Sequence, residues 1–217
     1  MHKPTLIIGN KNYSSWSLRP WFLLRHTGID FDEIQISLAG PDARAQILRY
    51  SPSGKVPVLK DGVVTVWDSL AIAEYVAEQQ PQLQLWPKDS AARATAHAVS
   101  AEMHSGFGAL RENMTQNCRK FLPGKGRAPG VAEDIARITA LWTDCRERFG
   151  ADGEFLFGQF SIADAMFAPV VLRFRTYAVE LDPVCARYAQ NILTLPAIEA
   201  WVAQASAETE VLPQFER

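Results

Sequence analysis

The sequence has little cysteine and no long apolar run. Its three cysteines are far apart and odd in number, and they form neither a CxxC pair nor a zinc-binding spacing: Cys118, Cys145 and Cys185. This usage fits a reducing, cytoplasmic location. No apolar run approaches the ~20 residues of a membrane span, and residues 1–4 have no signal-peptide core. We therefore expect a cytoplasmic protein with no membrane partner.

An excess of charge of either sign is also missing. The 217 residues carry a net charge of −2, so there is no basic footprint for a nucleic-acid partner. With 47% apolar and 21% charged residues, the composition is that of a globular protein. This length predicts one domain or two small ones, in either case with enough core to fold unaided.

The first 79 residues alternate between predicted strands and helices. Strands are predicted over 5–9 and 31–38 and, as a hairpin around an Asp-Gly turn, over 58–66, and helices over 16–26, 42–50 and 70–79. A parallel βαβ unit, a helix, an antiparallel hairpin and a closing helix make a mixed four-stranded sheet with helices on its faces.

After Pro81 we find no convincing strand. Residues 82–89 read as a linker that ends at an N-cap, Ser90, so we expect one domain over 1–81 and a second, all-helical domain over 90–217. Its helices are predicted over 91–118, as one long helix, and over 131–149, 183–190 and 196–205, with a loop over 121–130 and a frayed tail over 208–217.

A nearly unbroken apolar helix should run through the middle of that second domain. Ser161 and Asp164 have the spacing of a capping box, and the residues after them are almost all apolar up to Leu172. Pro169 should kink this helix or end it.

The turn at 13–17 (Tyr-Ser-Ser-Trp-Ser) places hydroxyls at a helix N-terminus. Free N–H groups and the helix dipole there favour an anion, and a thiolate held there would have a lowered pKa. The alternative, which the motif alone favours, is that Ser14 or Ser15 is simply an N-cap. Ser14 and Ser17 have the spacing of a CxxC pair without sulfur, so dithiol chemistry is excluded at this turn.

The stretch 51–59 reads as a turn that leads into a strand. Pro57 favours an extended Val56, whose backbone groups could pair with a peptide-like ligand as one rung of added sheet. An ordinary loop-to-strand turn is the alternative that the pattern alone favours. Lys55 is either a point charge for a ligand carboxylate or a solvated surface lysine.

Asp68 and Ser69 allow two interpretations as well. Either residue can cap the helix that follows, and on the motif alone a cap is favoured. The pair could instead hold a zwitterionic head group, with Ser69 on the carboxylate and Asp68 on the ammonium. His97 and His104 lie seven apart without a third ligand, so we predict no metal site.

Together, these motifs resemble the cytosolic glutathione transferases. The matching stretches are 13–17, 53–59, 67–75 and 160–165, and the resemblance spans nearly the whole chain. It implies a fold class of α/β plus all-α, with a thioredoxin-like N-terminal domain and an all-helical C-terminal domain. It also implies glutathione as co-substrate: Val56 would pair with its cysteinyl backbone beside a cis Pro57, Asp68 and Ser69 would hold its γ-glutamyl head, and Lys55 would face a carboxylate.

The turn looks most like the serine-type, zeta-like branch, which includes maleylacetoacetate isomerases. The resemblance implies that Ser14 activates the thiol, with Ser15 a second candidate and Tyr13 a weaker third. Trp16 stands where the zeta pattern has Cys, Asp68 replaces the more usual Glu or Gln, and the run at 18–21 departs from Arg-Val-Arg.

The expected function is that of a glutathione transferase that activates the thiol for attack on a small electrophile. The alternatives are a glutathione-dependent cis-trans isomerase and a non-catalytic interaction protein of the same fold. We expect the electrophile pocket between the domains, with His104, Phe107 and Arg111 on one helix face lining it. The resemblance also implies a homodimer, with Trp67 and the start of the Ser90 helix as contact points.

Overall fold

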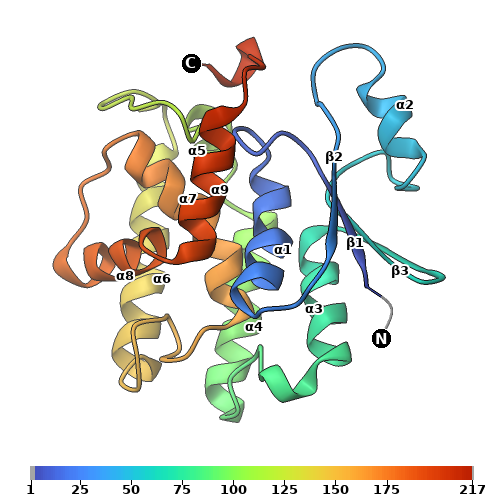
Figure 1. Cartoon of the computed structure of the whole chain (residues 1–217). Coiled ribbons are helices and arrows are strands. Elements are labelled where there is room, and N and C mark those ends of the chain that lie inside the picture. The colour runs from blue at the N-terminus through green and yellow to red at the C-terminus, as the bar shows by residue number, and fades with distance from the viewer. Residues whose placement is uncertain (1–2, 217) are drawn as a thin grey trace.

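The first part of the chain folds as the mixed four-stranded sheet that the sequence predicts (Figure 1). We describe residues 3–216 of a computed structural model. The strands are β1 (Thr5–Ile8), β2 (Asp32–Gln35), β3 (Val58–Asp61) and β4 (Val64–Trp67), and the helices are α1 (Ser15–His26), α2 (Ala43–Leu48) and α3 (Ser69–Gln79). The strand order is β2-β1-β3-β4, with β1 and β2 parallel and the other pairs antiparallel.

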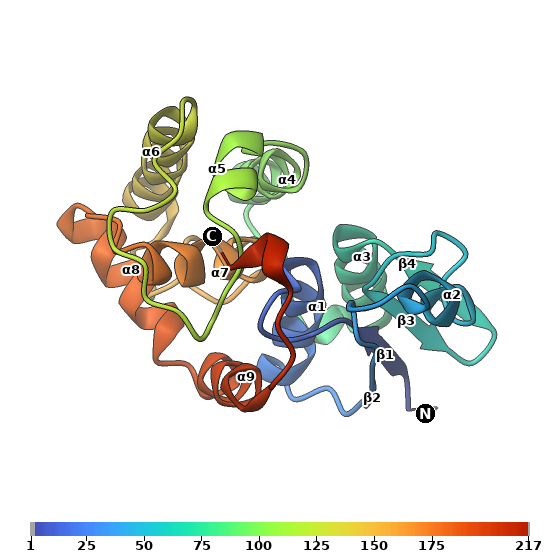
Figure 2. The same cartoon turned by 90° about the horizontal axis from the view of Figure 1, so that it is seen from above.

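The two faces of this sheet are covered by different helices. Side chains alternate along a strand, so Ile7 and Val58 pack with Ile47 of α2, whereas Leu6 and Leu59 belong to the large core on the opposite face. That core contains α1 and α3 and continues into the helical part of the chain. Figure 2 shows α2 on one side of the strands and α1 and α3 on the other.

The rest of the chain is helical. Its elements are η1 (Pro81–Leu83), α4 (Ser90–Ser105), α5 (Gly108–Asn113), α6 (Val131–Phe149), α7 (Ile162–Thr176), α8 (Pro183–Leu193), α9 (Pro196–Ala207) and η2 (Pro213–Phe215). The four named strands all precede Ser69, and the change to helices falls near residue 80, where the sequence predicts a linker. The boundaries at 81 and 90 stay predictions.

Helix α7 is the buried centre of this second part, as expected. The Asp164 carboxylate accepts hydrogen bonds from the backbone N–H of Ser161 (2.8 Å) and of Leu156 (3.1 Å), which fixes the start of the helix. The helix packs on α1, α4 and α8. Pro169 lies inside it and does not end it.

The prediction of one long helix over 91–118 is wrong. The chain turns at Gly106 and Phe107, and Phe107 takes a left-handed conformation (φ 62°). The Arg111 side chain holds this break, because it donates to the carbonyl oxygens of Gly106 (2.8 Å) and Met103. The cap of α4 is also shifted by one residue: Asp89, not Ser90, accepts the Ala92 N–H (2.8 Å).

The tail is not frayed. From α9 it crosses to the turn after β1 (Figure 2), and Leu212 is buried. The Glu208 carboxylate accepts the backbone N–H of Lys11 (2.6 Å) and of Asn12 (3.0 Å). We call residues 208–216 the C-terminal strap; Arg217 lies outside the described residues.

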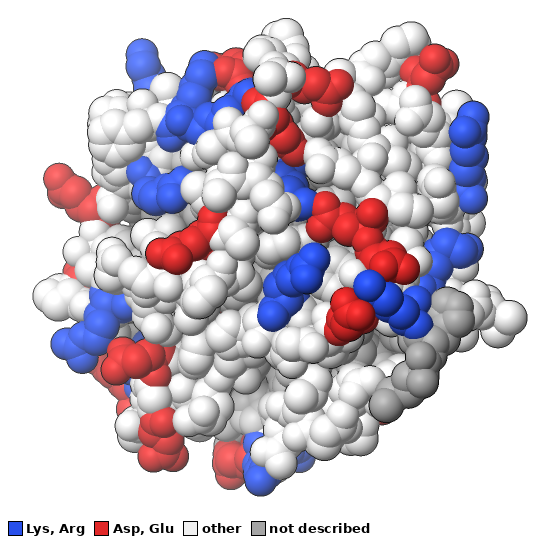
Figure 3. All heavy atoms as spheres, in the orientation of Figure 1, with Lys and Arg blue, Asp and Glu red and all other residues white. Residues whose placement is uncertain are grey.

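Charges are mixed on the visible surface. On the face drawn in Figure 3, acidic and basic side chains are interspersed. Within residues 3–216, no helix combines the length and the apolar character needed to cross a bilayer.

Candidate functional site

Two adjoining cavities lie where the sheet domain meets the helices. The sheet-edge cavity, of about 520 Å³, is lined by Ser53 and residues 55–57, by Asp68 and Ser69, and by His104. The helix-side cavity, of about 380 Å³, is lined by the 13–16 turn and by Arg111, Arg173 and Phe215 among others. Trp16, Lys55 and Val56 belong to both linings, so a ligand on the Val56 backbone can reach into either cavity.

The Val56–Pro57 peptide bond is cis, as the resemblance implies. Val56 is half-buried and Lys55 is exposed at the mouth of both cavities. Within residues 3–216, the backbone N–H and carbonyl of Val56 take part in no hydrogen bond. These two groups are therefore available to an extended peptide ligand.

Asp68 both caps α3 and faces the sheet-edge cavity. Its Oδ1 accepts the N–H groups of Leu70 (2.9 Å) and Ala71 (3.2 Å), and its Oδ2 lies 3.1 Å from Nε2 of His104. Ser69 is not the cap; its buried hydroxyl accepts from Arg19 Nη1 (3.3 Å). The cap and the ligand-facing interpretations of Asp68 are thus compatible, because they use different oxygens.

The three residues expected to line the electrophile pocket lie in three different places. Only Arg111 lines the helix-side cavity, whereas His104 lines the sheet-edge cavity beside Asp68. Phe107 lines neither cavity and is 7% exposed in the core, because the chain turns before it. Burial lowers the pKa of His104, and the nearby Arg19 and Arg111 lower it further against the opposing effect of Asp68.

Ser14 and Ser15 both line the helix-side cavity, and each is 6% exposed. Ser14 is the N-cap of α1: its hydroxyl accepts the Ser17 N–H (3.3 Å) and donates to the Ser17 hydroxyl (2.7 Å). The Ser15 hydroxyl accepts a hydrogen bond from Arg173 Nη2 (3.1 Å).

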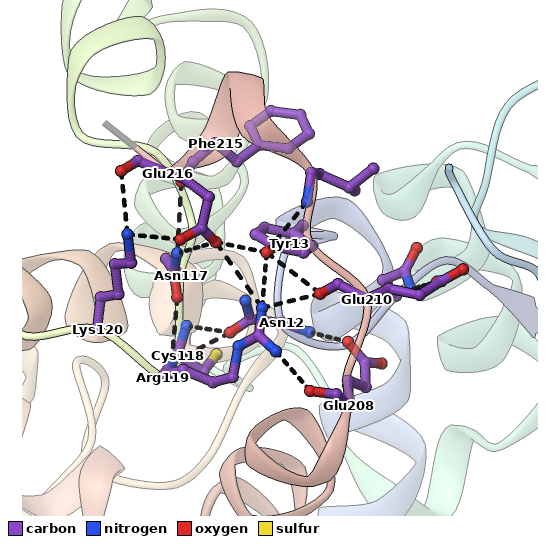
Figure 4. Close-up of polar contacts among 12 residues, drawn as sticks. Asn12, Tyr13, Asn117, Cys118, Arg119, Lys120, Glu208, Glu210, Phe215 and Glu216 are labelled. Atoms are coloured by element: carbon purple, nitrogen blue, oxygen red, sulfur yellow. Dashed lines mark hydrogen bonds and ion pairs between the residues drawn. The ribbon is translucent and has the colours of Figure 1, made fainter. Parts of the chain in front are cut away.

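The Tyr13 hydroxyl is occupied by the C-terminal strap (Figure 4). It donates to the Glu216 carboxylate (2.5 Å) and accepts from Arg119 Nη2 (2.7 Å) and from the Leu212 N–H (3.3 Å). The ring of Phe215 stacks on the Tyr13 ring with centroids 5.6 Å apart. Tyr13 therefore holds the strap in place and has no hydroxyl proton free for a thiol.

Two arginines flank Trp16 and a third, Arg173, lines the helix-side cavity with it; sequence reasoning missed Arg19 and Arg173. The guanidinium carbons of Arg19 and Arg111 lie 4.3 Å and 4.7 Å from the centre of the indole ring. Arg19 and Arg173 are buried, and they come from α1 and from α7, two helices that pack against each other. No spacing in the sequence signals Arg173, which lies 158 positions from the serine it contacts.

The helix-side cavity is positively charged. Its lining contains Lys55, Arg111 and Arg173 and, within the described chain, no acidic residue. One nitrogen of each arginine, Nη1, has no hydrogen-bond partner there. Burial lowers the pKa of Arg173 to about 9, so the side chain is still protonated at neutral pH. Buried charge without a counter-ion favours an anionic ligand.

A metal centre finds no support in the part of the chain that the structure describes. No three His, Cys, Asp or Glu side chains come close enough to hold a cation. His97 and His104 have different neighbours. The His97 ring stacks on Trp86 with centroids 3.9 Å apart, and its Nδ1 lies 3.3 Å from Oε1 of Glu74.

Comparison with known proteins gives matches along most of the chain. Residues 13–79 match the family model of the glutathione S-transferase N-terminal domain, and residues 128–204 match that of the C-terminal domain. A probable maleylacetoacetate isomerase of Caenorhabditis elegans is 28% identical over 203 residues, which cover 91% of this chain and 92% of that protein. Glutathione S-transferase Z2 of Arabidopsis thaliana is 24% identical, over 92% of this chain and 93% of that protein.

The fold is shared with solved structures. A glutathione transferase homolog from Burkholderia, crystallised with bound glutathione, superposes with a TM-score of 0.71 at 23% identity, covering 94% of this chain and 98% of that chain. At this identity the likeness concerns the arrangement of the sheet and the helices.

Proposed function

The chain belongs to the glutathione S-transferase family, and from this premise we propose that it is an enzyme that uses glutathione as co-substrate. Glutathione lies along the sheet-edge cavity, and its activated thiol attacks a small electrophile held in the helix-side cavity. The observation that carries the proposal is the unpaired backbone of Val56, since a peptide with free N–H and C=O groups is the natural partner of such an edge.

The two ends of the tripeptide have matching partners. The γ-glutamyl ammonium pairs with Asp68, whose Oδ2 faces the cavity, and its carboxylate lies at the N-terminus of α3 with Ser69. Lys55, exposed at the mouth, pairs with a carboxylate as a point charge. The sulfur then points to the turn that bears Ser14 and Ser15.

The chemistry needs the thiolate. The thiol proton leaves to water, the sulfur forms a bond to the electrophilic carbon, and the leaving group departs with its electron pair. A serine O–H that donates to the sulfur stabilises the anion and lowers the pKa of the thiol. Ser14 and Ser15 are the two candidates for this hydroxyl.

The binding mode is tested with Asp68→Asn. Asparagine caps a helix as well as aspartate does, so the start of α3 is kept while the negative charge is removed. Loss of a charged hydrogen bond of ~1.5–3 kcal/mol weakens binding of S-methylglutathione, measured by calorimetry, by roughly 10- to 150-fold. The matched control is Asp89→Asn, which removes the same charge from the cap of α4, outside both cavities, and leaves the affinity unchanged. Equal affinities in all three proteins would refute the proposed binding mode.

A second candidate reaction is glutathione-dependent cis-trans isomerisation. The observation that favours it is the unpartnered Nη1 of Arg111 in the helix-side cavity, which can take the carboxylate of an acidic substrate. In this reaction the sulfur adds to the double bond, the carbon–carbon bond rotates, and the carbon–sulfur bond breaks again, so glutathione is not consumed.

The two reactions are separated by their products. A chloroarene yields a glutathione conjugate with a transferase, whereas a cis-enedione acid yields its trans isomer without loss of glutathione with an isomerase. For an isomerase, Arg111→Gln raises KM for the acid and leaves KM for its uncharged methyl ester nearly unchanged. Equal effects on acid and ester would argue against a carboxylate at Arg111.

We further propose a homodimer in the cytoplasm. Trp67 is 47% exposed next to the sheet-edge cavity, which is unusual for so large an apolar side chain and suits a subunit interface. The three cysteines are all unpaired, in keeping with a reducing compartment. Light scattering of the wild type and of Trp67→Glu tests the dimer; a monomeric wild type would refute it.

A further inference from the structure

Ser14 and Ser15, the two serines at the start of α1, make different hydrogen bonds. Ser14 is committed to the protein: its hydroxyl donates to the Ser17 oxygen (2.7 Å), which also accepts the Gly9 N–H (3.1 Å), and it accepts the Ser17 N–H as the cap of α1. To donate to a ligand, Ser14 would have to give up its bond to the Ser17 hydroxyl, whose oxygen also anchors the residue that follows β1.

Ser15 is free to donate. Its oxygen accepts from Arg173 Nη2 (3.1 Å), and within residues 3–216 its O–H group donates to no protein acceptor. It lines the helix-side cavity next to Trp16 and Val56. A hydroxyl whose oxygen accepts from a cation is polarised and is a stronger donor.

Arg173 is fixed and lacks a counter-ion. It is 4% exposed; its Nε donates to the Met114 carbonyl (2.8 Å), and its Nη1 has no partner among the described residues. No ion pair joins it to a carboxylate in that part of the chain. An anion in the cavity would supply the missing charge.

Besides Arg173, the charged side chains that line this cavity are cations. Arg111 of α5 and Lys55 of the 51–57 loop line the same cavity, and the Tyr13 hydroxyl is bound by the strap. Tyr177, at the end of α7, shares a hydrogen bond with Thr115 (3.2 Å). Cys118 stays protonated, because burial raises its pKa to about 12. The Glu216 carboxylate is bonded to Tyr13, Asn117 and Lys120 and not to Arg173.

We propose that Ser15, held and polarised by Arg173, is the hydroxyl that donates to the glutathione thiolate, and that Ser14 is the helix cap. The inference rests on the proposed function and differs from the role that the resemblance implies for Ser14. Arg173 acts as a positioning residue from the helical part of the chain, and its charge compensates that of the thiolate. The thiol proton leaves to water, and the bonds of Ser15 and Arg173 stay intact throughout.

The test is the pKa of the bound thiol, followed by the ultraviolet absorbance of the thiolate as pH is varied. An opposite charge within ~4–6 Å shifts a pKa by ~1–3 units, so Ser15→Ala and Arg173→Gln are each expected to raise the thiol pKa by ~1 unit or more. Below the wild-type thiol pKa, kcat/KM then falls about tenfold, and it recovers at high pH. A merely structural defect would not be rescued by alkaline pH.

Two variants serve as controls. Arg175→Gln removes the same charge from the same helix; Arg175 is exposed and donates to the Cys118 carbonyl (3.0 Å), so the thiol pKa should not move. Ser14→Ala loses the cap and should lower the melting temperature, with a smaller shift in thiol pKa than Ser15→Ala. If Arg173→Gln does not fold, Ser15→Ala alone decides, because it leaves the bond from Arg173 to Met114 in place.

Binding of S-methylglutathione, which has no thiol, separates this inference from the proposed function. Ser15→Ala is expected to bind it within about twofold of the wild type while the thiol pKa rises. Normal binding with a thiol pKa that rises in Ser14→Ala but not in Ser15→Ala or Arg173→Gln would overturn the inference alone. A wild type that does not bind S-methylglutathione would overturn the proposed function and the inference with it.

Discussion

Replacing Glu216 by alanine should release the end of the C-terminal strap. In the native fold its carboxylate accepts from Tyr13 Oη (2.5 Å), from Asn117 Nδ2 (3.0 Å) and from Lys120 Nζ (2.5 Å) (Figure 4). These bonds close a segment of chain onto residues about 100 and 200 positions away. The strap has further anchors at Glu208 and Glu210, so the loss concerns local opening of residues 212–216.

The size of the effect follows from these contacts. Each hydrogen bond to the partly buried carboxylate contributes ~1 kcal/mol after competition with water, and the half-exposed pair with Lys120 contributes at most ~1 kcal/mol. The total of ~2–3 kcal/mol corresponds to a roughly 30- to 150-fold increase in the opening equilibrium.

Hydrogen exchange of the strap measures this opening directly. The Leu212 N–H is bonded to the Tyr13 hydroxyl (3.3 Å) and the Phe215 N–H to the Leu212 carbonyl (2.9 Å), so both should exchange faster by that factor in Glu216→Ala. The matched control is Glu180→Ala, which removes the same charge from an exposed loop position. Unchanged protection at Leu212 and Phe215 would refute the role of Glu216 as the anchor.

The same change should alter the helix-side cavity, because Phe215 is part of its lining. We expect a higher KM for the electrophile and an unchanged KM for glutathione. The pKa of Glu216 is lowered: burial opposes ionisation, but the bonds from Lys120 and Tyr13 outweigh it. Because the carboxyl pKa is lowered, Glu216 stabilises the closed strap fully above pH 4.5 and loses this effect as pH falls below that value. At such low pH, the strap amides of the wild type and of Glu216→Ala should exchange at the same rate.

Three further predictions concern buried groups. Asp164→Ala should lower the free energy of unfolding, measured with urea, by ~2–4 kcal/mol, because the N–H groups of Ser161 and Leu156 lose their buried acceptor; a loss below ~1 kcal/mol would contradict this. Burial raises the pKa of Asp164 from 3.8 to about 6, so the native state binds this proton more tightly than the unfolded state does. The free energy of unfolding should therefore fall as pH rises between those two values. Asp164→Asn should lack this pH dependence in the same urea titrations. Burial raises the pKa of each of the three cysteines to about 12, so a thiol reagent at neutral pH should label them only after urea is added, and rapid labelling of the native protein would show this to be wrong.

Much of the fold could be predicted because its signals are local. Short apolar or extended runs indicated the strands, and an Asp-Gly pair indicated the hairpin between β3 and β4. The spacing of Ser161 and Asp164 indicated the start of α7. In each case the residues that interact lie within a few positions of one another, so their spacing carries the information.

The site could be predicted only in part. Residues 13–16, the 53–57 stretch and the pair Asp68–Ser69 do line the two cavities, because each holds its shape through its own turn or helix start. The sequence did not predict which side-chain oxygen accepts or donates each hydrogen bond. The bond of Ser14 to Ser17 and the cap of α3 by Asp68 both depend on the backbone geometry of the turn.

By itself, the sequence determined the order of strands and helices up to residue 79, the turns, and the helix start at each cavity-lining motif, since those follow from neighbouring residues. Tertiary structure alone decided three features: the break of the predicted long helix by Arg111, the course of the strap along Asn12 and Tyr13, and the approach of Arg173 to Ser15. The physical reason is the same for the strap and for Arg173. A buried charge or a chain terminus takes whichever partner the packing of helices brings near, and no spacing along the chain records a partner 158 or 203 positions away.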